Sequence, residues 1–133
     1  MGGQITNNTP EVLMVYGPPN NNEYDNGTYI AKSGLISDKN IDVDGFYVPA
    51  DRKIKQFSGI VVDGPVAVKF INGIHFTVTQ EGAIYIVDRP NFGLFKPSEY
   101  CRPTNYPKCV NWDIPNWTYP EVLSTCADCI NKI

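Results

Sequence analysis

The sequence has little of what enzymes most often depend on. It contains a single histidine, His75, among 133 residues. It has no glycine-rich phosphate-binding loop, no G-x-S-x-G nucleophile motif and no H-E-x-x-H metal motif. A lone histidine in a strand-like segment is usually a packed or half-exposed residue, because a catalytic base needs a nucleophile within reach. We therefore expect that the protein is not an enzyme.

Concentrated basic charge and long apolar runs are also missing. Lys and Arg number 11 against 14 Asp and Glu, which gives a formal net charge of -3. Nucleic-acid binding needs a concentrated basic face, so we expect no nucleic-acid partner. No run approaches the roughly 18 consecutive apolar residues of a membrane span, so we expect none.

The first residues, MGGQIT, lack the basic and apolar regions of a classical secretory signal. This predicts synthesis in the cytoplasm, which is compatible with a virion or another extracellular particle as the final location. Gly2 and Thr6 fit the N-myristoylation pattern. That pattern is short, and one acyl chain anchors a protein only marginally, so Gly2 is a lipidation candidate on the pattern alone.

Residues that favour turns and strands are abundant. Eleven Gly and eleven Pro indicate many turns between short elements. A chain of 133 residues is long enough for one domain with its own core. We divide this domain, 1–133, into an N-terminal arm over 1–28, a β-meander core over 29–95 and a C-terminal extension over 96–133. In the arm, the apolar run at 11–16 predicts one short strand.

The central segment carries the clearest β pattern. Its strand-like runs are separated by three polar–glycine pairs, Asp63-Gly64, Asn72-Gly73 and Glu81-Gly82. An Asn-Gly pair between two such runs favours a tight hairpin, so we predict that the strand ending at Ile71 pairs with the strand beginning at Ile74. Both faces of this hairpin carry apolar residues, which is typical of a sheet covered on both sides. We expect a mainly β fold, a small antiparallel β-sandwich or partly open barrel.

The C-terminal extension is rich in proline and aromatic residues, and we expect it to end in one short α-helix over about residues 119–132. Thr118 and Glu121 have the spacing of a capping box. Trp117 and Val122 are placed as a hydrophobic staple. From Val122 onward, apolar residues recur at helical spacing, which predicts that one face of the helix packs against the body.

All four cysteines lie in this extension, at Cys101, Cys109, Cys126 and Cys129. A zinc site usually uses two tight cysteine pairs, and only the second pair here is tight. A redox pair needs its first cysteine at a helix N-terminus, whereas this pair falls inside the predicted helix. Two disulfides that fasten the extension to the helix, or reduced thiols in the core, fit the spacing better. The sequence leaves these alternatives open.

One acidic stretch raises the question of calcium. Asn40, Asp42 and Asp44 fit the first three ligand positions of an EF-hand-type loop, Phe46 fits the carbonyl position and Asp51 closes the loop. The first ligand is a neutral amide, the closing residue is the shorter Asp, and neither flank has helical periodicity. The stretch is therefore not an EF-hand, and an acidic turn between two strands explains the same residues more simply.

Aromatic residues of the extension are candidates for a contact surface. Tyr100, Tyr106, Trp112 and Trp117 could stack on a sugar or contact a protein. Packing of the extension against the sheet explains them more simply, and we favour that interpretation.

Three classes of function follow from these patterns. The first is a non-enzymatic structural or interaction subunit of a larger assembly, such as a minor capsid, virion or appendage component. Such a subunit would bind other protein subunits through its arms, in a homo- or hetero-oligomer, and needs no cofactor. The second is a small module that binds calcium, zinc or carbohydrate. The third is an enzyme that uses loop carboxylates or thiols.

Overall fold

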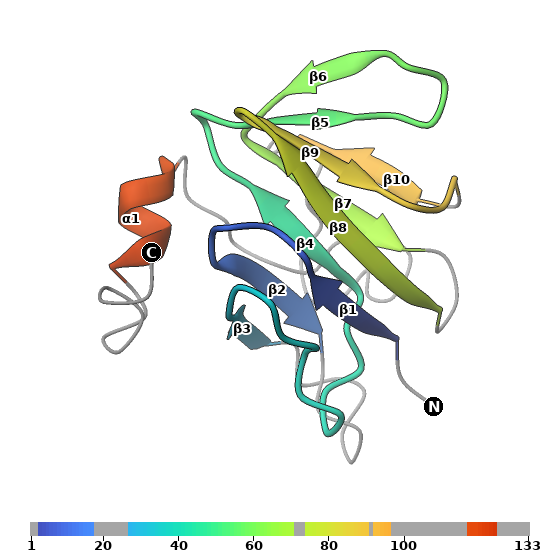
Figure 1. The fold of residues 1–133 in the computed structure, drawn as a ribbon, viewed down its shortest axis with the longest axis vertical. Coiled ribbons are helices and arrows are strands. Elements are labelled where there is room, and N and C mark those ends of the chain that lie inside the picture. Colours follow the sequence, from blue (N-terminus) through green and yellow to red (C-terminus); the bar gives the residue numbers. More distant parts are fainter. Residues whose placement is uncertain (1–2, 18–26, 71–73, 91, 97–116, 125–133) are drawn as a thin grey trace.

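The computed structural model describes residues 3–17, 27–70, 74–90, 92–96 and 117–124. Within them the chain forms ten strands and one short helix. The strands make two five-stranded sheets that face each other (Figure 1). The expected mainly β fold with a short C-terminal helix is confirmed, and the described strands form two separate sheets rather than a closed barrel.

The first sheet, sheet A, has the strand order β1-β8-β9-β5-β6. Its strands are β1 (Gln4–Asn7), β8 (His75–Glu81), β9 (Ile84–Val87), β5 (Lys53–Lys55) and β6 (Val61–Asp63). β1 runs parallel to β8 and β5 runs parallel to β9, whereas the other two pairs are antiparallel. The expectation of antiparallel pairing throughout is therefore wrong for this sheet. Alternation of apolar residues marks a strand but carries no information about the direction of its neighbour.

The second sheet, sheet B, is antiparallel throughout, with the order β10-β7-β4-β2-β3. Its strands are β10 (Phe92–Phe95), β7 (Val66–Phe70), β4 (Gly45–Val48), β2 (Leu13–Gly17) and β3 (Gly27–Ala31). The strand predicted in the N-terminal segment is confirmed as β2, whose five residues are all buried. β1 belongs to sheet A and β2 belongs to sheet B. The two sheets therefore include residues of the segment 1–28, which we expected to form an arm.

The hairpin predicted around Asn72-Gly73 is wrong. β7 pairs with β4 and β10 in sheet B, whereas β8 pairs with β1 and β9 in sheet A. Phe70 and Phe76, on either side of this crossing, stack between the sheets with ring centroids 3.7 Å apart. Val66, Val68 and Phe70 face the inner core with Phe76, whereas Ala67 lies on the opposite face of β7. Both faces of β7 are apolar, so the pattern alone did not identify the inner one.

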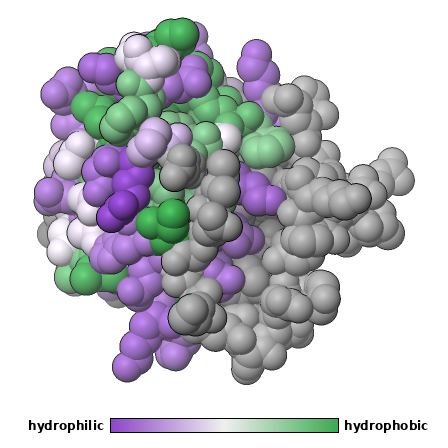
Figure 2. Space-filling view, turned by 90° about the vertical axis from the view of Figure 1, so that its right-hand side faces the viewer, coloured by the Kyte–Doolittle hydropathy of each residue, from purple (hydrophilic) through white to green (hydrophobic). Residues whose placement is uncertain are grey.

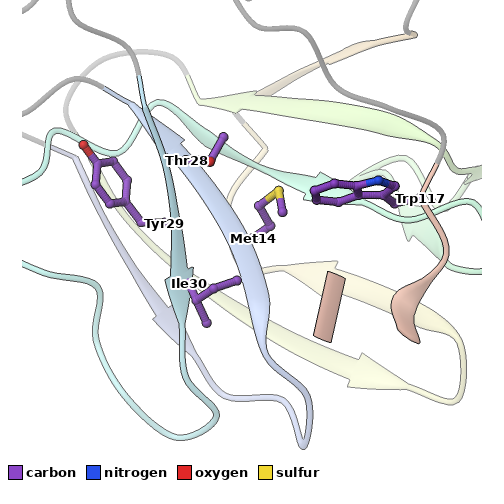
Figure 3. Close-up of a pocket in the computed structure, with 5 residues that line it drawn as sticks. All are labelled: Met14, Thr28, Tyr29, Ile30 and Trp117. Carbon is purple, nitrogen blue, oxygen red and sulfur yellow. The ribbon is translucent and has the colours of Figure 1, made fainter. Parts of the chain in front are cut away.

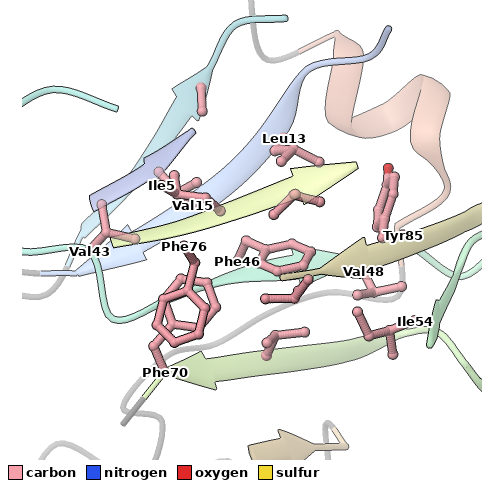
Figure 4. Packing of buried hydrophobic residues seen from close by; sticks show 14 of the residues in the cluster. Ile5, Leu13, Val15, Val43, Phe46, Val48, Ile54, Phe70, Phe76 and Tyr85 are labelled. Atoms are coloured by element: carbon pink, nitrogen blue, oxygen red, sulfur yellow. The ribbon is translucent and has the colours of Figure 1, made fainter. Parts of the chain in front are cut away.

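The core lies between the two sheets. Side chains from strands of both sheets meet there (Figure 4). Among the largest that are fully buried are Ile5, Leu13, Val15, Phe46, Val48, Ile54, Phe76 and Tyr85. This face-to-face packing is typical of a β-sandwich.

The outer face of sheet B has a second apolar cluster, which the C-terminal segment covers. This outer cluster joins β2, β4 and β7 to the helix α1 (Tyr119–Leu123) through Val12, Met14, Tyr16, Tyr47, Ala67, Tyr119 and Val122. The predicted capping box is present, and the Thr118 amide N–H donates to Glu121 Oε1 at 3.3 Å. Trp117 packs on the same cluster as Val122. The rest of the predicted helix, up to residue 132, lies outside the described residues.

Candidate functional site

The candidate calcium ligands are not gathered around one point. Asp42 Oδ1 accepts a hydrogen bond from the Gly3 amide N–H at 2.7 Å. The Asn40 amide N–H donates to Asp38 Oδ1 at 2.8 Å. Phe46 is fully buried in the middle of β4. In the described part of the chain, no group of three or more His, Cys, Asp or Glu side chains is placed to hold a metal ion.

The two ends of this acidic stretch have different roles. Asp51 Oδ1 accepts a hydrogen bond from the Tyr119 amide N–H at 2.7 Å, so this carboxylate fastens the start of α1 to the body. Asp44 lies next to Asp42 at the other end of β4. Burial, together with the negative charge of Asp42, raises the pKa of Asp44 to about 6, and Lys69 acts in the opposite direction. The charged form of Asp44 is therefore destabilised in the folded chain.

A partly buried ion pair joins the two sheets to the helix. The Glu11 carboxylate accepts from Arg52 Nε at 3.0 and 3.1 Å and from Arg52 Nη2. The Tyr85 hydroxyl donates to Glu11 Oε1 at 2.8 Å. The Arg52 guanidinium lies over the Tyr119 ring, 4.6 Å from its centroid. Tyr119 Oη in turn accepts from the Val12 amide N–H at 3.1 Å.

We call the cluster of Glu11, Arg52, Tyr85 and Tyr119 the clamp, because its interactions hold the two sheets and the helix together. Its hydrogen bond to Glu11 raises the pKa of Arg52, so the guanidinium stays charged. Burial, reinforced by the charge of Glu11, raises the pKa of Tyr85 far above its ordinary value, so the phenol stays a donor. Each group already has a partner inside the cluster. The cluster was not predictable from the sequence, because Glu11 and Tyr85 are 74 positions apart and no motif links them.

His75 and Trp117 are the other predicted residues that the structure describes. His75 is exposed on β8, where its Nε2 shares a hydrogen bond with the Thr6 hydroxyl. Trp117 is held firmly: its amide N–H donates to Tyr47 Oη at 2.9 Å, and its carbonyl accepts from the Ala50 amide N–H at 2.6 Å.

Beside Trp117 lies a pocket of about 230 Å³ on the outer face of sheet B (Figure 3). It is lined by Met14, Thr28, Tyr29, Ile30 and Trp117. In Figure 3 the Met14 side chain extends toward the Trp117 ring, which closes one side of the hollow. The lining combines the apolar side chains of Met14, Ile30 and Trp117 with the polar Thr28, and in Figure 3 the Tyr29 side chain points away from Met14 and Trp117.

The remaining candidates lie outside the described residues. These are the four cysteines, Cys101, Cys109, Cys126 and Cys129, the aromatic residues Tyr100, Tyr106 and Trp112, and the lipidation candidate Gly2. The disulfide, zinc and lipidation hypotheses therefore stay predictions.

Apolar side chains are exposed on the hairpin formed by β5 and β6. Phe57 is 64% exposed, Ile60 62% and Val61 41%. We call these three residues the apolar hairpin edge. β5 and β6 lie at the top of Figure 1, and Figure 2, turned about the vertical axis, shows hydrophobic residues at the same end. Leu35 and Ile36, next to β1, are also exposed.

Comparisons with known proteins do not assign the chain to a family. No protein-family model, no curated protein and no solved structure matches it. Among the described residues, no helix has the length and apolar character needed to cross a membrane.

Proposed function

We propose that this chain is a non-enzymatic structural or interaction subunit of a larger protein assembly, such as a minor capsid, virion or appendage component. The observation that carries the proposal is the apolar hairpin edge of Phe57, Ile60 and Val61. Full burial of one large apolar side chain contributes roughly 1.5–3 kcal/mol, so a partner that covers these residues gains appreciable free energy. Exposed apolar side chains that cluster in this way are characteristic of interaction sites.

The polar groups of the body support the same proposal. Glu11, Arg52 and Tyr85 satisfy one another, and Asp51 fastens the helix. These groups stabilise the fold, so we expect surface residues to determine which partner the protein binds. The partners we propose are other protein subunits.

The native size of the protein tests this proposal. We expect the full chain from its native source to elute as a stoichiometric complex larger than a monomer. Replacing Phe57 and Ile60 by Ser should release the partner. A matched pair of changes, Leu35→Ser and Ile36→Ser, also removes two exposed apolar side chains and should retain it. A strict monomer with no stoichiometric partner would contradict the proposal.

A second candidate function is a small ligand-binding module, and the pocket beside Trp117 favours it. Its volume of about 230 Å³ is somewhat below that of drug-sized sites, which suits a small apolar or sugar-like ligand. The chain has only two Trp residues. Titration with simple sugars should therefore change the fluorescence of a Trp112→Phe variant and leave a Trp117→Phe variant unchanged. No change in the Trp112→Phe variant would exclude sugar binding at this pocket.

A further inference from the structure

Strand β3 forms an edge of sheet B. It pairs with β2 on one side, and among the described residues no strand lies on its other side. One hydrogen bond gives the direction of the backbone groups in β2: the Tyr16 carbonyl accepts from the amide N–H of Asp44, which directly precedes β4, at 2.8 Å. The N–H and C=O groups of Tyr16 therefore face β4. Because the direction of these groups alternates along a strand, those of Val15 face β3.

The outward backbone groups of β3 belong to two residues that also line the pocket beside Trp117. Tyr29 lies opposite Val15 and faces β2 with its backbone groups, so those of Thr28 and Ile30 face outward. The side chains of Thr28 and Ile30 line the pocket on the outer face of sheet B, together with Trp117 (Figure 3). Four outward backbone groups and an apolar hollow are therefore side by side.

We infer that β3 binds an extended peptide segment of a partner protein, which continues sheet B as an additional antiparallel strand and places one large apolar side chain in the pocket. This inference rests on the proposed function, in which the partners are other protein subunits. It adds a contact surface in sheet B, whereas the apolar hairpin edge belongs to sheet A (Figure 1). Strand addition of this kind combines main-chain hydrogen bonds with pockets for alternate side chains.

The hydrogen-bonding groups identify the occupant as a peptide backbone. Thr28 and Ile30 each offer one outward donor and one outward acceptor, two residues apart on β3. An antiparallel strand with residues opposite both of them exchanges two hydrogen bonds at each, so all four outward groups gain a partner. A sugar has hydroxyl groups without this regular alternation of N–H and C=O, so it would leave part of the edge unpaired.

The same register places a side chain of the partner at the pocket. Side chains directly opposite each other on neighbouring strands point to the same face, with Cβ atoms roughly 4.5–5.5 Å apart. The partner residue opposite Thr28 therefore points to the outer face of sheet B. Thr28 has a small side chain, so a larger apolar one beside it reaches over it toward Met14 and Trp117. We therefore expect a large apolar residue at this position of the segment.

The size of the surface favours a short segment over the face of a folded domain. A standard interface between folded proteins buries roughly 1,200 Å² or more in total. One five-residue edge strand and a pocket of about 230 Å³ offer much less, but they match a few residues of extended chain. We expect a dissociation constant on the order of 0.1 mM for an isolated peptide. In a larger assembly such a contact acts together with others.

Three substitutions of the exposed Thr28 separate the backbone contribution from that of the pocket. Thr28→Pro removes the outward N–H, a change that an edge strand tolerates because this group has no partner in the sheet. Thr28→Phe retains the N–H and fills the pocket. Thr28→Val retains the N–H and the size of the side chain, and is the matched control. We expect the first two to weaken peptide binding by about tenfold or more and Thr28→Val to stay within about threefold.

The probe is a positional library of fluorescein-labelled, amidated heptapeptides, in which each pool fixes one residue type at one position. Fluorescence anisotropy measures binding of each pool to the full chain, and pools with a large apolar residue at a central position should bind most tightly. The best peptide is then titrated with the three variants, after urea unfolding has shown that each is folded. Hydrogen exchange at the Thr28 and Ile30 amides should slow when peptide is added, whereas the Tyr29 amide, which faces β2, should not change.

The outcomes separate the inference from the proposed function. Pools that bind equally, or not at all, would overturn the inference. Weaker binding by Thr28→Phe with full binding by Thr28→Pro would mean that the pocket is filled without strand pairing, which also overturns it; a sugar that binds in this way would support the second candidate function. The native complex, tested with the Phe57 and Ile60 variants, is a separate measurement. Its absence would contradict the proposed function even where peptide binding is retained.

Discussion

The negative charge of Asp44 lowers the stability of the folded chain. Asp44 directly precedes β4, and burial and the negative charge of Asp42 raise its pKa to about 6 from an ordinary value of 3.8. Between these two pH values the folded chain binds a proton that the unfolded chain has released. The contribution of Asp44 to stability is therefore full below about pH 4 and is lost as the pH rises through about 6. Most carboxylates in folded proteins act in the opposite direction.

The magnitude follows from the size of the shift. One pKa unit corresponds to about 1.4 kcal/mol, so a shift of this size corresponds to roughly 3 kcal/mol at neutral pH. Solvent still reaches part of the Asp44 side chain, and Lys69 would lose a favourable counter-charge if Asp44 were neutral. We therefore expect Asp44→Asn to raise the free energy of unfolding by about 1–2 kcal/mol at pH 7 and by about zero below pH 4.

Urea unfolding followed by fluorescence, at several values between pH 3.5 and 7.5, measures the difference between Asp44→Asn and the unaltered chain. Asp38→Asn removes the same charge from an exposed position and controls for net charge. A difference that is constant with pH, or a destabilising Asp44→Asn at pH 7, would refute the argument that burial of Asp44 dominates.

Further predictions concern the clamp, the close packing and the acidic stretch. Glu11→Gln removes the main counter-charge of the partly buried Arg52, which keeps Asp51 as a second one, and should lower the free energy of unfolding by about 1–3 kcal/mol, whereas Tyr85→Phe removes one hydrogen bond and should lower it by about 1–2 kcal/mol; both are measured by urea unfolding. Gly45→Ala should abolish cooperative unfolding, because an added Cβ would lie 1.7 Å from the Val68 carbonyl oxygen. Addition of calcium or of a chelator should leave the melting temperature unchanged. A higher melting temperature with calcium would show that the protein binds calcium and would make the acidic stretch, residues 40–51, a candidate site again.

Local features of the fold were predictable from the sequence. The β8–β9 hairpin at Glu81-Gly82 forms as expected, and Gly82 has a φ of +60°, a conformation that glycine adopts without strain. Thr118 and Glu121 lie three residues apart and form the predicted cap. In each case the interacting residues are neighbours in sequence, so the pattern contains the whole interaction.

The pairing of distant strands was not predictable in the same way. Asn72-Gly73 has the composition of a hairpin turn, yet β7 and β8 belong to different sheets, because apolar residues on both faces of β7 allow it to be covered from either side. The clamp escaped prediction for a related reason. Glu11 begins an apolar run and Arg52 lies in a polar segment, and only the packing of two sheets brings them together.

The position of the clamp connects the stability of the fold to the surface we propose for binding. Arg52 directly precedes β5, so its pairing with Glu11 fixes the base of the hairpin that carries Phe57 and Val61. A strand held rigid before it binds loses less conformational entropy on pairing. We therefore expect Glu11→Gln to weaken binding of the partner by more than a surface change far from the apolar hairpin edge, even at temperatures where the variant is folded. Sedimentation velocity on the complex of the partner with Glu11→Gln, and with Thr79→Glu, which changes an exposed residue of β8, compares the two. Equal dissociation constants would mean that the hairpin is ordered without the clamp.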